Sequence, residues 1–208
     1  MSSVTWDQVL AWRMRRQYVE RAEEAPALDI ARRLAGVQAQ VASAAELAVA
    51  VRQRNPATGE VARALLDERT LVKTWAARGT LHLLPADQAA AHLVLCSAAR
   101  YWEKGSWQRA SGATPADVEA IAAAAADALS GGAALTREEL TRTVLDRTGA
   151  EHLAELLGSG WGMLLKPLAW WGVLCYGPRR ATGSRSPHLP DGCPAGRAFR
   201  RWRTPPAR

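Results

Sequence analysis

The chain has 208 residues, of which 48% are hydrophobic and 23% are charged, so it can bury a core, and a wholly disordered chain is excluded. No apolar run approaches the roughly 20 residues of a membrane-spanning helix, and the first residues have neither the basic head nor the apolar stretch of a signal peptide. The three cysteines, Cys96, Cys175 and Cys193, lie far apart and are odd in number. They predict no disulfide framework and no zinc site, and we expect a cytoplasmic protein.

The net charge of +7 comes from the C-terminal tail. Residues 178–208 hold eight arginines, one acid (Asp191) and six of the 11 prolines, whereas the rest of the chain holds 19 basic and 19 acidic side chains. A basic tail is typical of nucleic-acid-binding proteins. A stretch read out of frame from a GC-rich gene would also be rich in arginine and proline, so both interpretations stay open. The isoelectric point is therefore no evidence for DNA binding.

Helix signals dominate the body of the chain. Thr5 and Thr136 each begin a capping box, and Thr114 precedes a proline at the first helical position. The helical spacing of apolar residues then predicts helices over the following segments: 5–16, 28–35, 43–51, 60–68, 87–100, 114–129, 136–145 and 159–169.

Strand signals are fewer. Residues 80–83 alternate in polarity after an Arg-Gly turn, and we expect 70–76 to be their hairpin partner. Residues 172–176 read as a further strand. The segment 180–190, where its partner would follow, shows no alternation.

Two cycles of helices followed by a strand predict two winged-helix modules. In such modules a helix enters the DNA major groove and the hairpin touches the backbone. We expect a first module over 1–100, a polar connector over 101–113, an incomplete second module over 114–178, and a disordered basic tail over 179–208. The predicted fold class is mainly α with small β-hairpins, in tandem winged-helix (helix-turn-helix) modules.

Four segments carry a family resemblance, and they occur in the order TWDQVLAWRMRR, GVQAQ, LVKTWAARGTLHLLP and WGMLLKPLAWWGVLCYGP. Across them, over residues 4–178, the sequence resembles the winged-helix DNA glycosylases of the AlkZ/YcaQ kind. Members of this family are longer, and they excise N7-alkylated purines, in some cases from interstrand crosslinks, without a metal or cofactor. The resemblance implies an enzyme that hydrolyses an N-glycosidic bond in alkylated double-stranded DNA. We expect it to act as a monomer associated with the nucleoid, without contact with a membrane.

The catalytic signature of one branch of this family is Gln-x-Gln, and Gln38-Ala39-Gln40 matches it. In an extended segment Gln38 and Gln40 point the same way and Ala39 faces inward. An amide does not ionise near neutral pH, so it is no ordinary general base. An N7-alkylated purine is already cationic, however, and leaves as a neutral base. The two amides then need only position a water and turn their negative dipoles toward the developing sugar cation.

The candidate DNA contacts of the hairpin are Lys73, Arg78, Thr80 and His82. Lys73 and Arg78 are expected to meet backbone phosphates, with pairing to nearby acids as the alternative. His82 alternates with core-facing leucines, so we expect its side chain at the surface, in contact with a phosphate or sugar or in a structural hydrogen bond.

The tryptophans divide into two groups. We expect one set to lie mostly in the core: Trp6, Trp12, Trp75, Trp161, Trp170 and Trp171. Trp102 and Trp107, in the polar connector, are the candidates for stacking on bases.

Three hypotheses follow for the function. The first is a monofunctional DNA glycosylase with Gln38 and Gln40 at the water. The second is a non-catalytic winged-helix DNA-binding regulator, and the third is an inactive, truncated remnant of a glycosylase.

Overall fold

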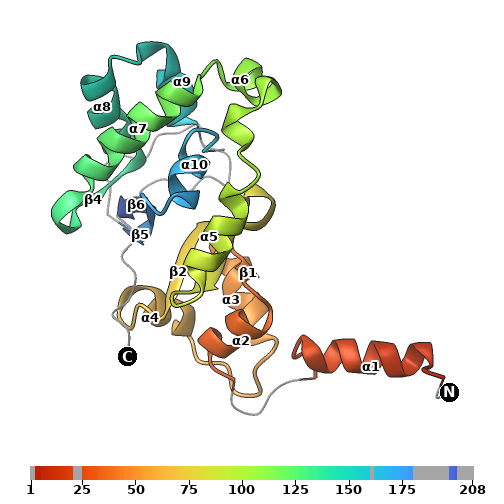
Figure 1. Cartoon of the computed structure of the whole chain (residues 1–208). Coiled ribbons are helices and arrows are strands. Elements are labelled where there is room, and N and C mark those ends of the chain that lie inside the picture. The colour runs from red at the N-terminus through yellow and green to blue at the C-terminus, as the bar shows by residue number, and fades with distance from the viewer. Residues whose placement is uncertain (1–2, 21–24, 160–161, 180–196, 201–208) are drawn as a thin grey trace.

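The computed structural model describes residues 3–20, 25–159, 162–179 and 197–200, and it is mainly helical with two small antiparallel sheets (Figure 1). This confirms the predicted mainly α class. Its described α-helices are α1 (Trp6–Arg16), α2 (Ala27–Arg33), α3 (Ala42–Ala50), α4 (Glu60–Leu66), α5 (Ala89–Ser97), α6 (Gly105–Ser111), α7 (Pro115–Ala128), α8 (Arg137–Thr148), α9 (Ala154–Gly158) and α10 (Leu165–Trp170). None of these helices is long and apolar enough to cross a bilayer.

Threonines begin three of the helices, as the sequence predicts. The hydroxyl groups of Thr5, Thr114 and Thr136 each accept a hydrogen bond from the backbone N–H three residues later, and the side chain at that position bonds back to the threonine N–H. Each reciprocal pair satisfies backbone donors that the first helical turn leaves without partners.

The first sheet contains the predicted hairpin and one added strand. Strands β2 (Leu71–Trp75) and β3 (Leu81–Pro85) are antiparallel, and β1 (Val37–Gln38) pairs with the other edge of β3, giving the order β1-β3-β2. Every residue of β2 and β3 is buried. The expected alternation of buried and exposed positions is therefore wrong, because the sheet is covered on both faces.

The second sheet contains a strand from the basic tail. Strands β4 (Ala134–Leu135), β5 (Cys175–Arg179) and β6 (Arg197–Arg200) pair antiparallel in the order β4-β6-β5. The partner of β5 is thus present, later in the chain than 180–190. The expectation of a wholly disordered 179–208 is wrong at Arg197–Arg200, where the backbone completes ladders with two strands. The rest of that tail, 180–196 and 201–208, lies outside the described residues.

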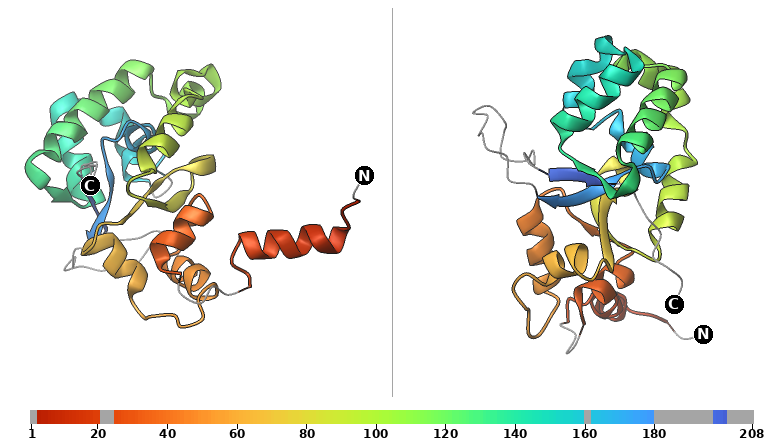
Figure 2. Two further views of the ribbon diagram at one scale, coloured as in Figure 1. Left: turned by 60° about the horizontal axis from the view of Figure 1, so that its bottom comes forward. Right: turned by 90° about the vertical axis from the view of Figure 1, so that its left-hand side faces the viewer.

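The hairpin β2–β3 belongs to two hydrophobic cores. Leu71 and Leu83 pack in a core with α2, α3 and α4, whereas Trp75 and Leu81 pack in a larger core with α7 to α10. The Trp75 ring also lies 5.2 Å from the ring of Tyr176 on β5. The sheets consequently lie between the two groups of helices (Figure 2).

Helix α1 corrects one expectation about the tryptophans. Trp6 is 78% exposed and Trp12 is 57% exposed, and no residue of α1 is buried. The helix extends away from the rest of the molecule (Figures 1 and 2). The prediction that these two side chains lie in the core is wrong, because helical spacing of apolar residues does not require a partner within the chain.

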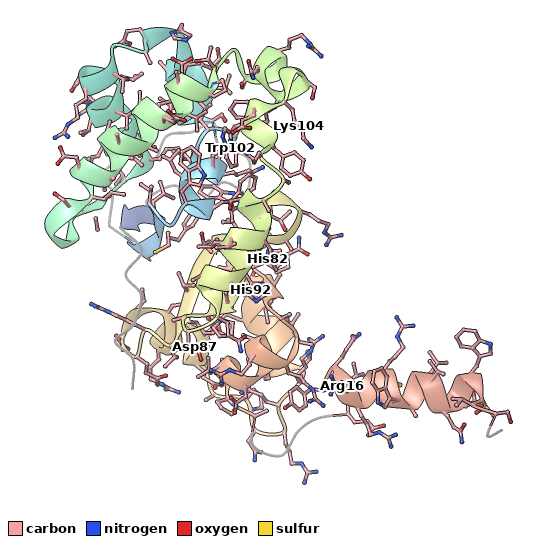
Figure 3. The ribbon with its side chains drawn as sticks, viewed as in Figure 1. Arg16, His82, Asp87, His92, Trp102 and Lys104 are labelled. Carbon is pink, nitrogen blue, oxygen red and sulfur yellow. The ribbon has the colours of Figure 1, made fainter. Side chains whose placement is uncertain are left out.

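The segment predicted as a polar connector corrects another expectation. Trp102, labelled in Figure 3, is 5% exposed, and its ring meets that of Trp171 edge-on at a centroid distance of 5.0 Å. Trp107 is partly buried against the same core. Base stacking by Trp102 is therefore excluded. Trp75 and Trp170 are buried as expected, and Trp161 lies outside the described residues.

Candidate active site

The glutamine segment begins at a backbone position that only glycine fits well. Gly36 has a φ of +118°, and a Cβ added there would lie 2.8 Å from Cδ2 of Leu84. Positive φ of this size is costly for residues with a side chain. Gly36 thus lets the chain turn out of α2 and run alongside β3 as the edge strand β1.

The strand that follows sets the directions of the two glutamines. Gln38 pairs with His82 in the sheet, and the Ala39 N–H donates to the Leu81 carbonyl at 2.7 Å. Ala39 is 1% exposed, whereas Gln38 and Gln40 are both exposed. The two amides accordingly lie on one side of the strand, as the sequence predicts for an extended segment.

The amides differ in how they are held. Gln40 Oε1 accepts a hydrogen bond of 3.3 Å from the Leu81 N–H, which orients this amide and leaves one lone pair of the oxygen available. Gln38 makes no side-chain hydrogen bond to the described residues, so its amide can turn toward a ligand. One glutamine is therefore anchored and the other is free to adjust.

Both glutamines line an open pocket of about 500 Å³ between β1 and α3. The residues that line it are Leu34, Gly36, Val37, Gln38, Gln40, Val41, Ala44, Ala48 and Arg52. Its long polar side chains are two amides and one guanidinium, and the residues lining it include no carboxylate. Chemistry in this pocket thus depends on hydrogen bonding and dipoles rather than on a general base that ionises near neutral pH.

His82 stands beside the glutamines but is not at the surface. His82 is 9% exposed, so the expected surface orientation is wrong. Val72 and Leu84, which lie on the same side of the sheet as His82, pack with Ala89 of α5. Its Nδ1 lies 3.0 Å from the Thr80 carbonyl oxygen, and because a carbonyl can only accept, Nδ1 carries the proton. His82 and Gln38 form a non-hydrogen-bonded cross-strand pair, in which side chains are closest.

The structure does not bring Lys73 to this pocket. Lys73 is 4% exposed on β2, and its Nζ lies 5.7 Å from the centre of the Tyr176 ring. It lines a separate pocket that also contains Glu46, whose pKa is raised by burial and then by Glu60. Lys73 and the two glutamines thus lie on opposite sides of the sheet.

Arg78 and Thr80 lie at the tip of the hairpin. Arg78 is exposed and has a φ of +56°, and the Thr80 hydroxyl donates to the Ala77 carbonyl at 3.2 Å. Arg78 lines a second open pocket, of about 760 Å³, together with Lys166 of α10. Burial lowers the pKa of the Lys166 ammonium below its usual range. The hairpin tip is accessible, and it is not part of the glutamine pocket.

Sequence reasoning missed two of these residues. Arg52 lies outside the segments that carry the resemblance, and Lys166 lies within one of them without any signal of its own. Each lines its pocket together with residues from distant segments. In the described part of the chain, no three His, Cys, Asp or Glu side chains gather to form a metal site.

Comparison with known proteins identifies relatives over nearly the whole chain. The family model described as DNA glycosylase AlkZ-like matches residues 31–207. An interstrand DNA cross-link repair glycosylase of Streptomyces sahachiroi is 50% identical over 177 residues, covering 85% of this chain and 47% of the relative. The solved structure of Streptomyces sahachiroi DNA glycosylase AlkZ matches with a TM-score of 0.84 at 42% identity, covering 98% of this chain and 51% of that one. The chain thus spans about half the length of the relatives it matches.

Proposed function

This chain belongs to the AlkZ-like DNA glycosylase family, and from that membership we propose that it removes N7-alkylated purines from double-stranded DNA. The relative from Streptomyces sahachiroi acts in the repair of interstrand DNA cross-links, and the proposal extends to lesions of that kind. The observation that carries it is the pocket in which two amides lie side by side with no carboxylate.

The proposed reaction is hydrolysis of the N-glycosidic bond. The bond between the sugar and the cationic purine breaks, the base departs neutral, and water adds its oxygen to the sugar carbon and loses a proton. Because the leaving group needs no proton, the barrier lies in stabilising the sugar cation and placing the water. Oxygens of Gln38 and Gln40 accept hydrogen bonds from that water, with Gln40 oriented by the Leu81 N–H.

The neighbouring residues support this pocket. His82 is fixed by its bond to the Thr80 carbonyl and lies next to Gln38, so we propose that it limits the directions that the Gln38 amide can take. Arg78 and Thr80, at the accessible hairpin tip, are proposed to contact the DNA backbone as the wing of a winged-helix module.

Base release tests the proposal directly. Duplex DNA treated with a methylating agent releases 7-methylguanine, which is separated and measured over time with the chain and with a Gln38→Ala/Gln40→Ala variant. We expect the double variant to lose about 10²-fold or more in rate, in the range reported when positioned polar groups are removed. Gln108→Ala, on α6 and outside the pocket, is the matched control.

The outcomes separate the hypotheses. Equal rates for the chain and the double variant would remove the glutamines from the mechanism. Tight binding to unmodified DNA without base release would favour the non-catalytic regulator, and neither binding nor release would favour the inactive remnant.

A further inference from the structure

We infer that Arg52 is the phosphate-binding residue of the glutamine pocket and holds the DNA backbone beside the nucleotide being cleaved. The inference rests on the proposed function and adds to it a residue that reads the backbone rather than the base. Arg52 follows α3, is partly exposed, and supplies the one cation among the residues that line this pocket.

The hydrogen bonds of Arg52 leave part of its guanidinium available. Its Nε donates to the Gln17 carbonyl at 3.0 Å, and its Nη1 donates to the Ala48 carbonyl at 2.6 Å. Nη2 has no partner among the described residues, and no carboxylate there pairs with Arg52. A guanidinium held at two points with its remaining donors unpaired suits the oxygens of a phosphate.

The charge of Arg52 decides which part of the substrate it meets. An N7-alkylated purine is cationic, and positive charge also develops on the sugar as the bond breaks. A guanidinium would repel both, whereas it attracts the phosphate diester. The backbone is therefore expected to pass on the Arg52 side of the pocket, with the sugar facing the two amides.

The bond to Gln17 continues this side of the pocket toward α1. The last turn of α1 carries Arg13, Arg15 and Arg16, and Figure 3 shows Arg16 at the end of the helix nearest the body. One guanidinium in the pocket and three more in the adjoining last turn of α1 suit a phosphate backbone, which carries one charge at each nucleotide.

A matched arginine separates this role from a structural one. Arg33 donates through Nε to the Arg16 carbonyl at 3.0 Å, so it ties the end of α1 to the body as Arg52 does, but it does not line the pocket. Arg52→Met and Arg33→Met thus each remove one hydrogen bond to the C-terminal end of α1, and Arg33→Met also removes the guanidinium that lies 5.4 Å from the Tyr18 ring. Only Arg52→Met removes the proposed phosphate contact in the pocket.

The test is the salt dependence of DNA binding. The probe is a fluorescent duplex that contains one tetrahydrofuran abasic-site analogue, which keeps the phosphates and has no base to release. Dissociation constants are measured by anisotropy between 50 and 200 mM KCl. Loss of one phosphate contact lowers the slope of log affinity against log salt by about 0.9, so the wild type loses about 3.5-fold more affinity over this range than Arg52→Met.

Arg52→Lys supplies a second measurement. It keeps a positive charge but cannot keep both carbonyl bonds, so a phosphate role predicts a slope close to that of the wild type, while a purely structural role predicts a variant that behaves like Arg52→Met. In base release, Arg52→Met is expected to raise KM more than it lowers kcat.

Two results would overturn the inference. An unchanged slope for Arg52→Met, or an equal fall for Arg33→Met, would show that Arg52 serves only to hold α1. If either result is found while the wild type still releases base and the double glutamine variant does not, the proposed function stands and only the role of Arg52 is rejected. Absence of both DNA binding and base release would reject the two together.

Discussion

Gly36→Ala is expected to disturb the glutamine pocket from its backbone. The residue precedes the strand β1, which pairs with the edge of β3, and its φ is +118°. An added Cβ would lie 2.8 Å from Cδ2 of Leu84 and 3.4 Å from the carbonyl oxygen of Leu83. Leu84 is fully buried, so its side chain has little room to withdraw. The substitution therefore meets a backbone conformation that alanine disfavours and a contact that is too short.

The two effects have different magnitudes and can be separated. A residue with a side chain held in a sparsely populated backbone region costs about 1–3 kcal/mol, and overpacking a core costs about as much again, so the free energy of unfolding should fall by about 2–6 kcal/mol. Gly149→Ala is the matched control, because Gly149 has φ at +65° and an added Cβ would meet nothing within 4 Å. That variant should lose only about 1–2 kcal/mol.

Urea unfolding of five proteins completes the test. They are the wild type, Gly36→Ala, Leu84→Ala, the double variant of these two, and the control Gly149→Ala, and base release is measured alongside. We expect the cost of Gly36→Ala to be smaller in the Leu84→Ala background, because the clash is gone. Two results would refute the close approach of Gly36 to β3. One is a loss of unfolding free energy in Gly36→Ala no larger than that in Gly149→Ala, and the other is a double variant whose loss equals the sum of the losses in Gly36→Ala and Leu84→Ala.

The remaining predictions concern the tryptophans and Lys166. Trp102→Ala should lower the free energy of unfolding, measured with urea, by about 3–5 kcal/mol, because it leaves a cavity in a core. Trp12 is exposed, so Trp12→Ala should change that free energy by no more than about 0.5 kcal/mol. Equal losses for the two variants would contradict the placement of α1. Burial lowers the pKa of Lys166 in the folded chain from 10.5, so the unfolded chain binds this proton more tightly and stability rises with pH toward 10.5. Lys166→Met should accordingly be more stable than the wild type near pH 7, by a margin that shrinks toward pH 10.5, and a constant margin would argue against the burial of the ammonium.

Local signals in the sequence predicted local structure well. The capping threonines, the hairpin about Arg78 and Gly79, and the common direction of Gln38 and Gln40 all depend on residues within a few positions of one another. Each is fixed by short-range sterics or hydrogen bonding, which the sequence pattern carries directly.

Features made by distant segments were not predictable in this way. His82 is buried between β1, which comes from more than 40 residues earlier, and the side of the sheet on which Ala89 of α5 packs. Arg52 acquires its orientation from Gln17, 35 residues earlier. The strand Arg197–Arg200 has no alternating pattern of its own, and it forms because β4 and β5 offer free edges on either side of it.

The hairpin shared by the two cores has a consequence for how the molecule comes apart. Leu71 and Leu83 stabilise one core, while Trp75 and Leu81 stabilise the other. If one core unfolds, β2 and β3 therefore lose packing contacts on which the other core also depends. Denaturation should then follow a single sigmoid rather than two steps. Any force transmitted from the helices of one half would also reach β3, and through it the strand that bears the glutamines.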